Sequence, residues 1–285
     1  MIHSVYHLFC DLVVNKKHLT STRKLTQFPF DKKILSCRNE GKFPDFAIRL
    51  NKDKSVYSGG ELIELKDSSS SYTVSSFNST IPTGEKNIGS LIEGKRNRIR
   101  EQMEKAGDDI LSFPLRQVYY LVRGKKGPKT KVGLVHGKFF ETIRVPELIS
   151  KSFFQALEEA TEGADPQLFN ELKEKIGKLL TNQETFSKVR TINKASVSLR
   201  FRIMTEVLAE GNILNTSKYP QIVDDSLNFF VPCHSPQEEK LQIERMKTAF
   251  EQRGQKELYG QLSKFTLQHL LNGPFLVFQF PLKSH

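Results

Sequence analysis

The 285-residue sequence has no tryptophan and only three cysteines, Cys10, Cys37 and Cys233. An odd number of cysteines without metal-ligand spacing indicates neither a disulfide framework nor a zinc site, and a reducing, cytoplasmic setting fits best. No apolar run approaches the roughly 20 residues that span a bilayer, so no membrane partner is expected. The glycines form neither a phosphate-binding loop nor a dinucleotide-binding motif, which argues against nucleotide hydrolysis.

Acidic residues are in short supply relative to basic ones, 32 against 43, which gives a formal net charge of +11. Residues 1–150 carry 26 basic and 16 acidic side chains, whereas residues 151–285 carry 17 and 16. A positive charge concentrated in one half favours a polyanionic partner, and nucleic acid is the first candidate. The alternative is a basic surface that only confers solubility.

The order of elements predicts a mixed α and β fold, with an antiparallel-rich sheet early and helices later. Strands are expected at 43–50 and 60–66, joined by a polar turn, and a second hairpin is expected from 117–123 and 131–136. Period-two alternation of apolar and polar residues predicts another strand at 196–203, and 275–280 is a short apolar run. Helices are predicted at 88–105, 146–162, 165–180, 235–253 and 255–271.

The sharpest feature is Pro44-Asp45, followed after eighteen residues by Glu64-Leu65-Lys66 at the end of a strand-like run. Residues two apart in a strand face the same way, so Glu64 and Lys66 project together. If the turn folds the two strands together, Asp45 sits beside Glu64. Two carboxylates can then bind Mg²⁺, which keeps waters and accepts phosphate oxygens as further ligands.

The tripeptide alone carries little information. An acidic residue, any residue and then Lys occurs six times, starting at Asp31, Glu40, Glu64, Glu93, Glu171 and Glu238. Only Glu64 ends an apolar strand-like run with Pro-Asp on another such segment just upstream. Without further information, the alternative to a metal site is a plain ion pair on an exposed hairpin.

Pro44-Asp45 with Glu64-Leu65-Lys66 resembles the PD-(D/E)xK nuclease superfamily, which includes most type II restriction endonucleases. The resemblance covers residues 43 to 66. It implies that Asp45 and Glu64 are metal ligands, that the main-chain carbonyl of Leu65 is a third, and that Lys66 is the catalytic lysine. The protonation role of Lys66, and whether Glu40 or Glu61 joins the metal site, stay open.

The flanking sequence favours a DNA substrate. Side chains that can bond to base edges follow the predicted catalytic strand between residues 68 and 83, although a polar surface loop is an equal reading. We expect DNA contacts from Ser69, Ser70, Ser71, Tyr72, Thr73, Ser75, Ser76, Asn78, Ser79 and Thr80. Phosphate contacts are expected from Lys95, Arg96, Arg98, Arg100, Lys125, Lys126, Lys129 and Lys131.

These observations predict a Mg²⁺-dependent, sequence-specific endonuclease acting on double-stranded DNA, of the type II restriction kind. The expected fold is a central mixed sheet with an antiparallel catalytic hairpin flanked by helices. Residues 1–150 would form the basic catalytic and DNA-binding core, and residues 151–285 a helix-rich continuation or subdomain packed on it. A homodimer is possible, because two-fold symmetry matches a palindromic site. The alternatives are a structure-specific repair or recombination nuclease and a non-enzymatic DNA-binding protein.

Overall fold

A computed structural model describes residues 4–39, 43–50, 59–73, 76–77, 83–93, 97–141, 154–156, 158–159, 167, 170–171, 174–175, 191–194, 197–200, 205–206 and 212–283. The helices are α1 Ser4–Val14, α2 Lys16–Ser21, α3 Gly89–Ile92, α4 Arg98–Lys105, α7 Pro236–Gln252 and α8 Lys256–Gly260, with two 3-10 turns, η1 Leu25–Gln27 and η2 Gly137–Phe140. The strands are β1 Leu35–Arg38, β2 Phe46–Ile48, β3 Leu62–Ser68, β4 Ser76–Phe77, β5 Glu85–Asn87, β6 Leu115–Lys126, β7 Lys129–His136, β8 Thr191–Lys194, β9 Val197–Arg200, β10 Thr205–Glu206, β11 Ser226–Pro232, β12 Ser263–His269 and β13 Gly273–Pro281.

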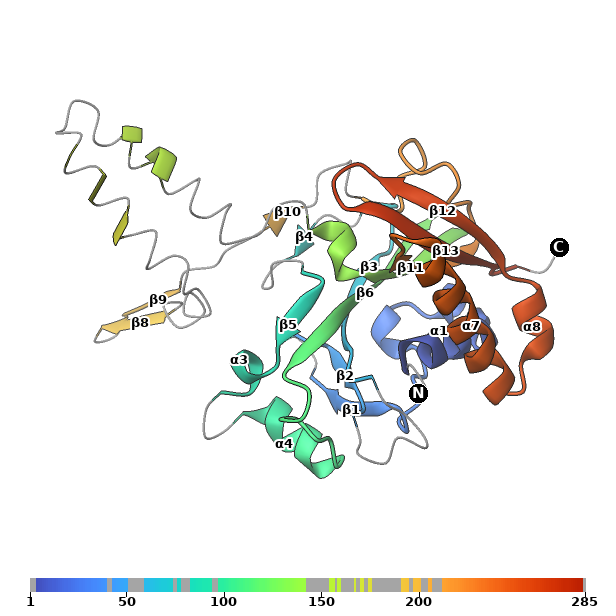
Figure 1. The fold of residues 1–285 in the computed structure, drawn as a ribbon, viewed down its shortest axis with the longest axis horizontal. Coiled ribbons are helices and arrows are strands. Elements are labelled where there is room, and N and C mark those ends of the chain that lie inside the picture. The colour runs from blue at the N-terminus through green and yellow to red at the C-terminus, as the bar shows by residue number, and fades with distance from the viewer. Residues whose placement is uncertain are drawn as a thin grey trace.

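A nine-stranded mixed sheet forms the centre of the fold, which confirms the mixed α/β class (Figure 1). Its order is β1-β2-β3-β6-β7-β11-β13-β12, with β5 paired to the start of β6. Strands β3 and β6 run parallel, as do β7 and β11, and the other neighbours in the sheet are antiparallel. Because β11, β12 and β13 join the same sheet as β1, β2, β3, β6 and β7, the sheet crosses the boundary expected at residue 150.

The sheet separates two apolar cores. On one face, α1, α7 and α8 pack over side chains such as Phe46, Ile63 and Phe229, and Figure 1 shows α1 beside α7. On the other face, α3, α4, η2 and residues 213–222 cover side chains such as Leu62 and Tyr120. Alternation along β3 therefore sends odd-numbered side chains toward α1 and even-numbered ones to the opposite face.

Several elements predicted from local pattern are confirmed. β2 pairs antiparallel with β3, β6 pairs antiparallel with β7, and the helix at 235–253 is α7. The β6–β7 strands run further than the alternation indicated, so the turn shortens to Gly127 and Pro128. The helical region expected at 88–105 contains two helices, and Asn97 caps the second by accepting hydrogen bonds from the backbone N–H groups of Ile99 and Arg100.

The helix predicted at 255–271 is wrong beyond its first turn. Only α8 is helical there, and Ser263–His269 forms the edge strand β12, paired with β13. Leu267 and His269 are buried and Phe265 is half-buried, while Lys264, Thr266 and Gln268 are exposed. That period-two pattern satisfies a strand, and pairing with β13 decides between strand and helix.

Other predicted elements fall partly outside the described residues. In the two ranges expected to be helices, 146–162 and 165–180, the residues described are helical, and their bounds lie outside the described part. The strand expected at 196–203 is described as β9 over Val197–Arg200, paired with β8 in a separate two-stranded sheet. Among the helices that the structure describes, none is long and apolar enough to cross a membrane.

Candidate functional site

The acidic residue of the Pro-Asp pair lies beside β3. Phe46 of β2 is paired with Ile63 of β3, so Asp45, just before β2, reaches the level of Glu64. The Asp45 Oδ2 atom accepts a hydrogen bond of 2.7 Å from the backbone N–H of Leu65. The antiparallel pairing thus brings the two sequence-predicted carboxylates together across eighteen residues of chain.

Glu64 and Lys66 project from the same face of β3, as their spacing predicted. The Lys66 Nζ atom donates to the Glu64 Oε1 atom over 3.0 Å. The Glu64 side chain is 10% exposed and the Lys66 side chain 17%, so the pair is largely removed from solvent. Ile63 and Leu65 contribute to the core on the α1 face. The hairpin is therefore more enclosed than the exposed ion pair that was the alternative reading.

Burial raises the pKa of Glu64 above its ordinary value. The Lys66 ammonium opposes this rise, and the charge of Asp45 adds to it. The Glu64 Oε2 atom is buried and has no hydrogen-bond partner among the described residues. A buried carboxylate oxygen without a partner is costly, and a cation bound next to it would relieve that cost.

The donor set fits Mg²⁺ in kind and number. Asp45 and Glu64 offer hard carboxylate oxygens, and Mg²⁺ is usually held by one or two carboxylates together with waters and substrate phosphate. Within the described part of the chain there is no group of three or more His, Cys, Asp or Glu side chains arranged to hold a metal. A dedicated protein cage of the calcium or zinc kind is therefore not formed by those residues, whereas a two-carboxylate Mg²⁺ site needs none.

Two neighbours of the site have no distinctive sequence signal. Tyr120 of β6 is paired with Glu64 in the parallel register, and burial raises its pKa, with the Glu64 charge adding to the rise. The Lys86 Nζ atom of β5 lies 4.8 Å from the ring centroid of Phe43, two residues before Asp45. β5 has three residues, too few for alternation to reveal a strand, so only the fold brings Lys86 here.

Glu61 lies apart from the carboxylate pair. Its side chain receives a backbone hydrogen bond from Val5 at the start of α1, and its charged neighbours include Arg116 and Arg245. It precedes Glu64 by three residues, which places it on the opposite face of the strand. Glu40, the other acidic residue in question, lies outside the described residues.

The residues predicted to contact phosphate differ in their exposure to solvent. Arg98, Arg100, Lys126 and Lys129 are exposed; Arg100 pairs with Glu104 and Lys129 with Asp224. The Lys125 Nζ atom is directed inward, donating to the carbonyl oxygens of Thr20 and Thr22. Lys131 is fully buried and bonded inside the protein, so it is not available for the predicted phosphate contact. Lys95 and Arg96 lie outside the described residues.

The residues of the polar segment after β3 also differ in their exposure to solvent. Ser69, Ser70 and Thr73 are exposed, whereas Ser71 and Tyr72 are half-buried. The Tyr72 hydroxyl donates to the Asp224 Oδ1 atom over 2.8 Å. This side chain therefore faces the protein and is not available for the contact with bases that the sequence had led us to expect. Ser76 belongs to β4, without a described side chain, and Ser75, Asn78, Ser79 and Thr80 lie outside the described residues.

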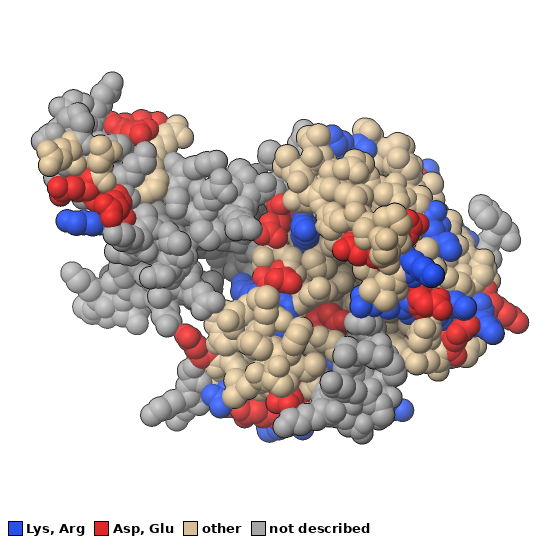
Figure 2. Space-filling view, in the orientation of Figure 1, with Lys and Arg blue, Asp and Glu red and all other residues tan. Residues whose placement is uncertain are grey.

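Charges of both signs are interspersed on the face seen in Figure 2, among the residues coloured there. The positive excess of residues 1–150 is therefore not displayed on this face as a field of one sign. Comparisons of the chain with protein-family models, with curated proteins and with solved structures give no match.

Proposed function

We propose that the protein is a Mg²⁺-dependent endonuclease that hydrolyses phosphodiester bonds in double-stranded DNA, with a site of the PD-(D/E)xK kind. One observation carries the proposal: Asp45, Glu64 and Lys66 converge on one hairpin, and a buried oxygen of Glu64 has no partner among the described residues. A structural ion pair accounts for the Lys66 contact but leaves that oxygen unsatisfied. A cation-binding site accounts for both.

Each residue has a separate role. Asp45 and Glu64 would hold the ion, with the Leu65 carbonyl as the third protein ligand that the resemblance implies. When bound, Mg²⁺ neutralises charge on the phosphate and makes a bound water more acidic. The Leu65 N–H group fixes the orientation of the Asp45 carboxylate. Lys66 is poised to stabilise the negative charge that develops on the phosphate oxygens during cleavage.

Features next to the site support DNA as the substrate. Ser69 and Ser70 are exposed three and four residues after Lys66, where their hydroxyls can bond to base edges or phosphates. Exposed cations on α4 and on the β6–β7 turn can bind further phosphates. We propose that the cleavage is sequence-specific, as in type II restriction endonucleases. Cutting both strands of a symmetric site would favour a homodimer.

The test is incubation of the purified chain with phage or plasmid duplex DNA, with Mg²⁺ or with EDTA, read on a gel. Discrete Mg²⁺-dependent fragments are the expected result. Asp45→Asn, Glu64→Gln and Lys66→Met should each lower cleavage by a factor on the order of 10³, because each removes a group acting on transition-state charge. Wild-type rates in these variants would refute the assignment.

The sequence offers a matched control. Glu171-Leu172-Lys173 repeats the tripeptide Glu64-Leu65-Lys66 elsewhere in the chain, so Glu171→Gln and Lys173→Met make the same chemical changes at a separate place in the sequence. Both should cleave like wild type. Smeared or nicked DNA would instead point to a nonspecific or structure-specific nuclease. Uncut DNA of shifted mobility, over several substrates, would point to the non-enzymatic DNA-binding protein.

A further inference from the structure

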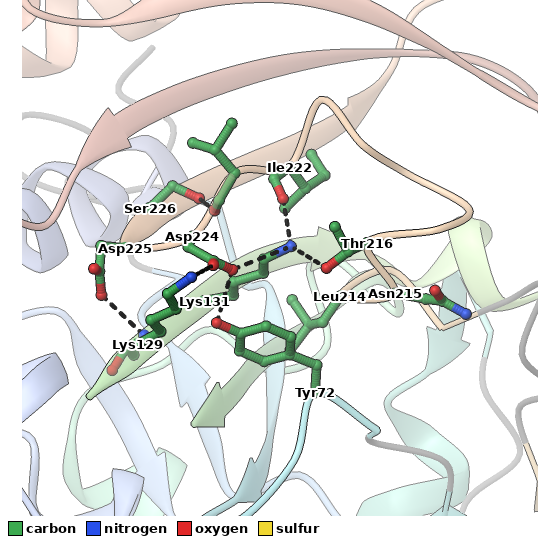
Figure 3. A network of polar contacts seen from close by, with 12 residues as sticks. Tyr72, Lys129, Lys131, Leu214, Asn215, Thr216, Ile222, Asp224, Asp225 and Ser226 are labelled. Atoms are coloured by element: carbon green, nitrogen blue, oxygen red, sulfur yellow. Dashed lines mark hydrogen bonds and ion pairs between the residues drawn. The ribbon is translucent and has the colours of Figure 1, made fainter. Parts of the chain in front are cut away.

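A polar cluster around the buried Lys131 side chain links the segment after β3 to residues 216–224 (Figure 3). We call it the Tyr72 node, and it consists of Tyr72, Lys129, Lys131, Thr216 and Asp224. Its members come from three parts of the chain: the segment following the catalytic strand, the β7 strand, and the segment leading into β11. None of the roles proposed above for the carboxylate site requires this cluster.

Lys131 is the buried cation of the node. Its Nζ atom donates to the Thr216 Oγ1 atom over 3.0 Å and to the Ile222 carbonyl oxygen over 2.5 Å, and it lies 3.8 Å from the Asp224 Oδ1 atom. Burial lowers its pKa, and Asp224 counters that effect. A fully buried ammonium is costly unless it is paired and hydrogen-bonded, and these three contacts supply its partners.

Tyr72 completes the node from the other side. Its hydroxyl donates to Asp224, and its ring centroid lies 4.9 Å from the Lys131 Nζ atom. The second Asp224 oxygen pairs with Lys129 over 2.8 Å. The tyrosine side chain is therefore held both by a hydrogen bond to a carboxylate and by a cation over its ring.

The backbone around Tyr72 lies close against β6. A Cβ atom added at Gly124 would lie 3.0 Å from the Ser71 carbonyl oxygen and 3.1 Å from the Tyr72 Cα atom. Such distances are too short for an alanine without movement of the chain. Glycine at position 124 thus permits residues 71 and 72 to pack directly against β6, the strand that pairs with β3.

Residues 68–73 are also ordered by their own hydroxyls. The Ser68 and Ser71 Oγ atoms are 3.1 Å apart, and the Thr73 backbone N–H donates to the Ser71 Oγ atom over 3.2 Å. Between these contacts Ser69 and Ser70 face solvent. Their Cα atoms lie within about 11 and 14 Å of the Lys66 Cα atom, because an extended chain spans at most about 3.6 Å per residue.

We propose that Tyr72 is a positioning residue, which fixes the 68–73 turn so that Ser69 and Ser70 meet the DNA next to the reacting phosphate. The inference rests on the proposed nuclease function and extends it by assigning a DNA-contacting turn and its anchor. Tyr72 does not touch the DNA; it acts through the turn that it holds. Its hydroxyl should therefore affect DNA affinity and leave the chemical step unchanged.

Tyr72→Phe is the sharpest test, because it removes the bond to Asp224 and keeps the ring beside Lys131. In Mg²⁺-dependent cleavage, well below the melting temperature, we expect KM for a duplex with a mapped site to rise about tenfold, equivalent to roughly 1.4 kcal/mol. The kcat at saturating DNA should stay at the wild-type value. In the DNA-free protein, hydrogen exchange at the Thr73 amide should become faster. Tyr259→Phe makes the same change on α8 and should alter none of these values.

The other outcomes separate the two proposals. An unchanged KM with faster exchange at Thr73 would overturn the inference, since the turn would be anchored without contacting DNA. Unchanged exchange, or a fall in kcat at constant KM, would overturn it as well. In those cases wild-type cleavage still supports the nuclease. If the wild-type chain cleaves no DNA with Mg²⁺, the proposed function fails and the inference fails with it.

Discussion

Glu61→Gln tests how the strand that carries Glu64 and Lys66 is anchored. Glu61 is 4% exposed and directly precedes β3. Its carboxylate receives a backbone hydrogen bond from Val5, while the Oε2 atom is buried with no hydrogen-bond partner among the described residues. Burial raises the pKa of Glu61 from 4.5 to about 7, against the opposing charges of Arg116 and Arg245. Glutamine has nearly the shape of the protonated side chain and cannot ionise.

The sign of the effect follows from proton linkage. Between pH 4.5 and about 7 the folded protein holds a proton on Glu61 that the unfolded chain has released, so this group makes the free energy of unfolding fall as pH rises. A difference of about 2.5 pKa units corresponds to roughly 3 kcal/mol, at 1.36 kcal/mol per unit. The penalty is absent below pH 4.5 and complete above the folded pKa of about 7.

The assay is urea denaturation of wild type and Glu61→Gln at several pH values from about 4.5 to about 8. Stability of the variant relative to wild type should increase by about 3 kcal/mol across this range, because other titrating groups cancel in the difference. Glu101→Gln makes the same change on the exposed surface of α4, where there is no burial to relieve. A Glu61→Gln difference that stays constant with pH would refute the reasoning.

Four shorter predictions follow from the same structure. Arg123→Met should lower the free energy of unfolding by about 1–3 kcal/mol in urea denaturation, because the fully buried guanidinium bonds twice to the partly exposed Asp67, over 2.8 and 2.7 Å; an unchanged midpoint would count against that pairing. Phe250→Ala should cost about 3–5 kcal/mol with an unchanged m-value, since Phe250 is fully buried in the core on the α1 face. Mg²⁺ at 100 times its Kd should stabilise wild type by about 2.7 kcal/mol in thermal melts, and Glu64→Gln should lose this gain. Lys126→Met should reduce the salt slope of DNA binding by about 0.9 if that exposed lysine meets a phosphate.

The hairpin at the site could be predicted because its information is local. A polar turn between two apolar runs, and a period of two within β3, suffice to bring Asp45 toward Glu64 and to put Lys66 on the same face. Whether the pair would be exposed could not be predicted. Its environment is set by elements from later in the sequence: β6 pairs with β3 in the sheet, and α3 and α4 contribute to the core on this face.

The later strands show where local pattern is insufficient. Gln255–Leu271 reads as a helix by composition, but its second half becomes β12 because β13 offers a partner edge. Likewise α1, whose residues from Val5 to Val13 are all buried, was not predicted, because burial on several sides removes the polar stripe that reveals a helix. In both cases long-range packing decides the structure.

The lysines near the β6–β7 turn also show that sequence alone could not predict which basic residues are exposed. Charge counting treats Lys125, Lys126, Lys129 and Lys131 as one group, and spacing cannot separate them. In the fold, Lys126 and Lys129 are exposed, whereas Lys125 bonds the end of α2 and Lys131 supports Tyr72. Part of the positive charge that suggests a polyanionic partner is therefore used to hold the turn beside the candidate site. The net charge of +11 consequently overstates the number of cations available to phosphates, and DNA affinity should depend on exposed positions and on turn geometry separately.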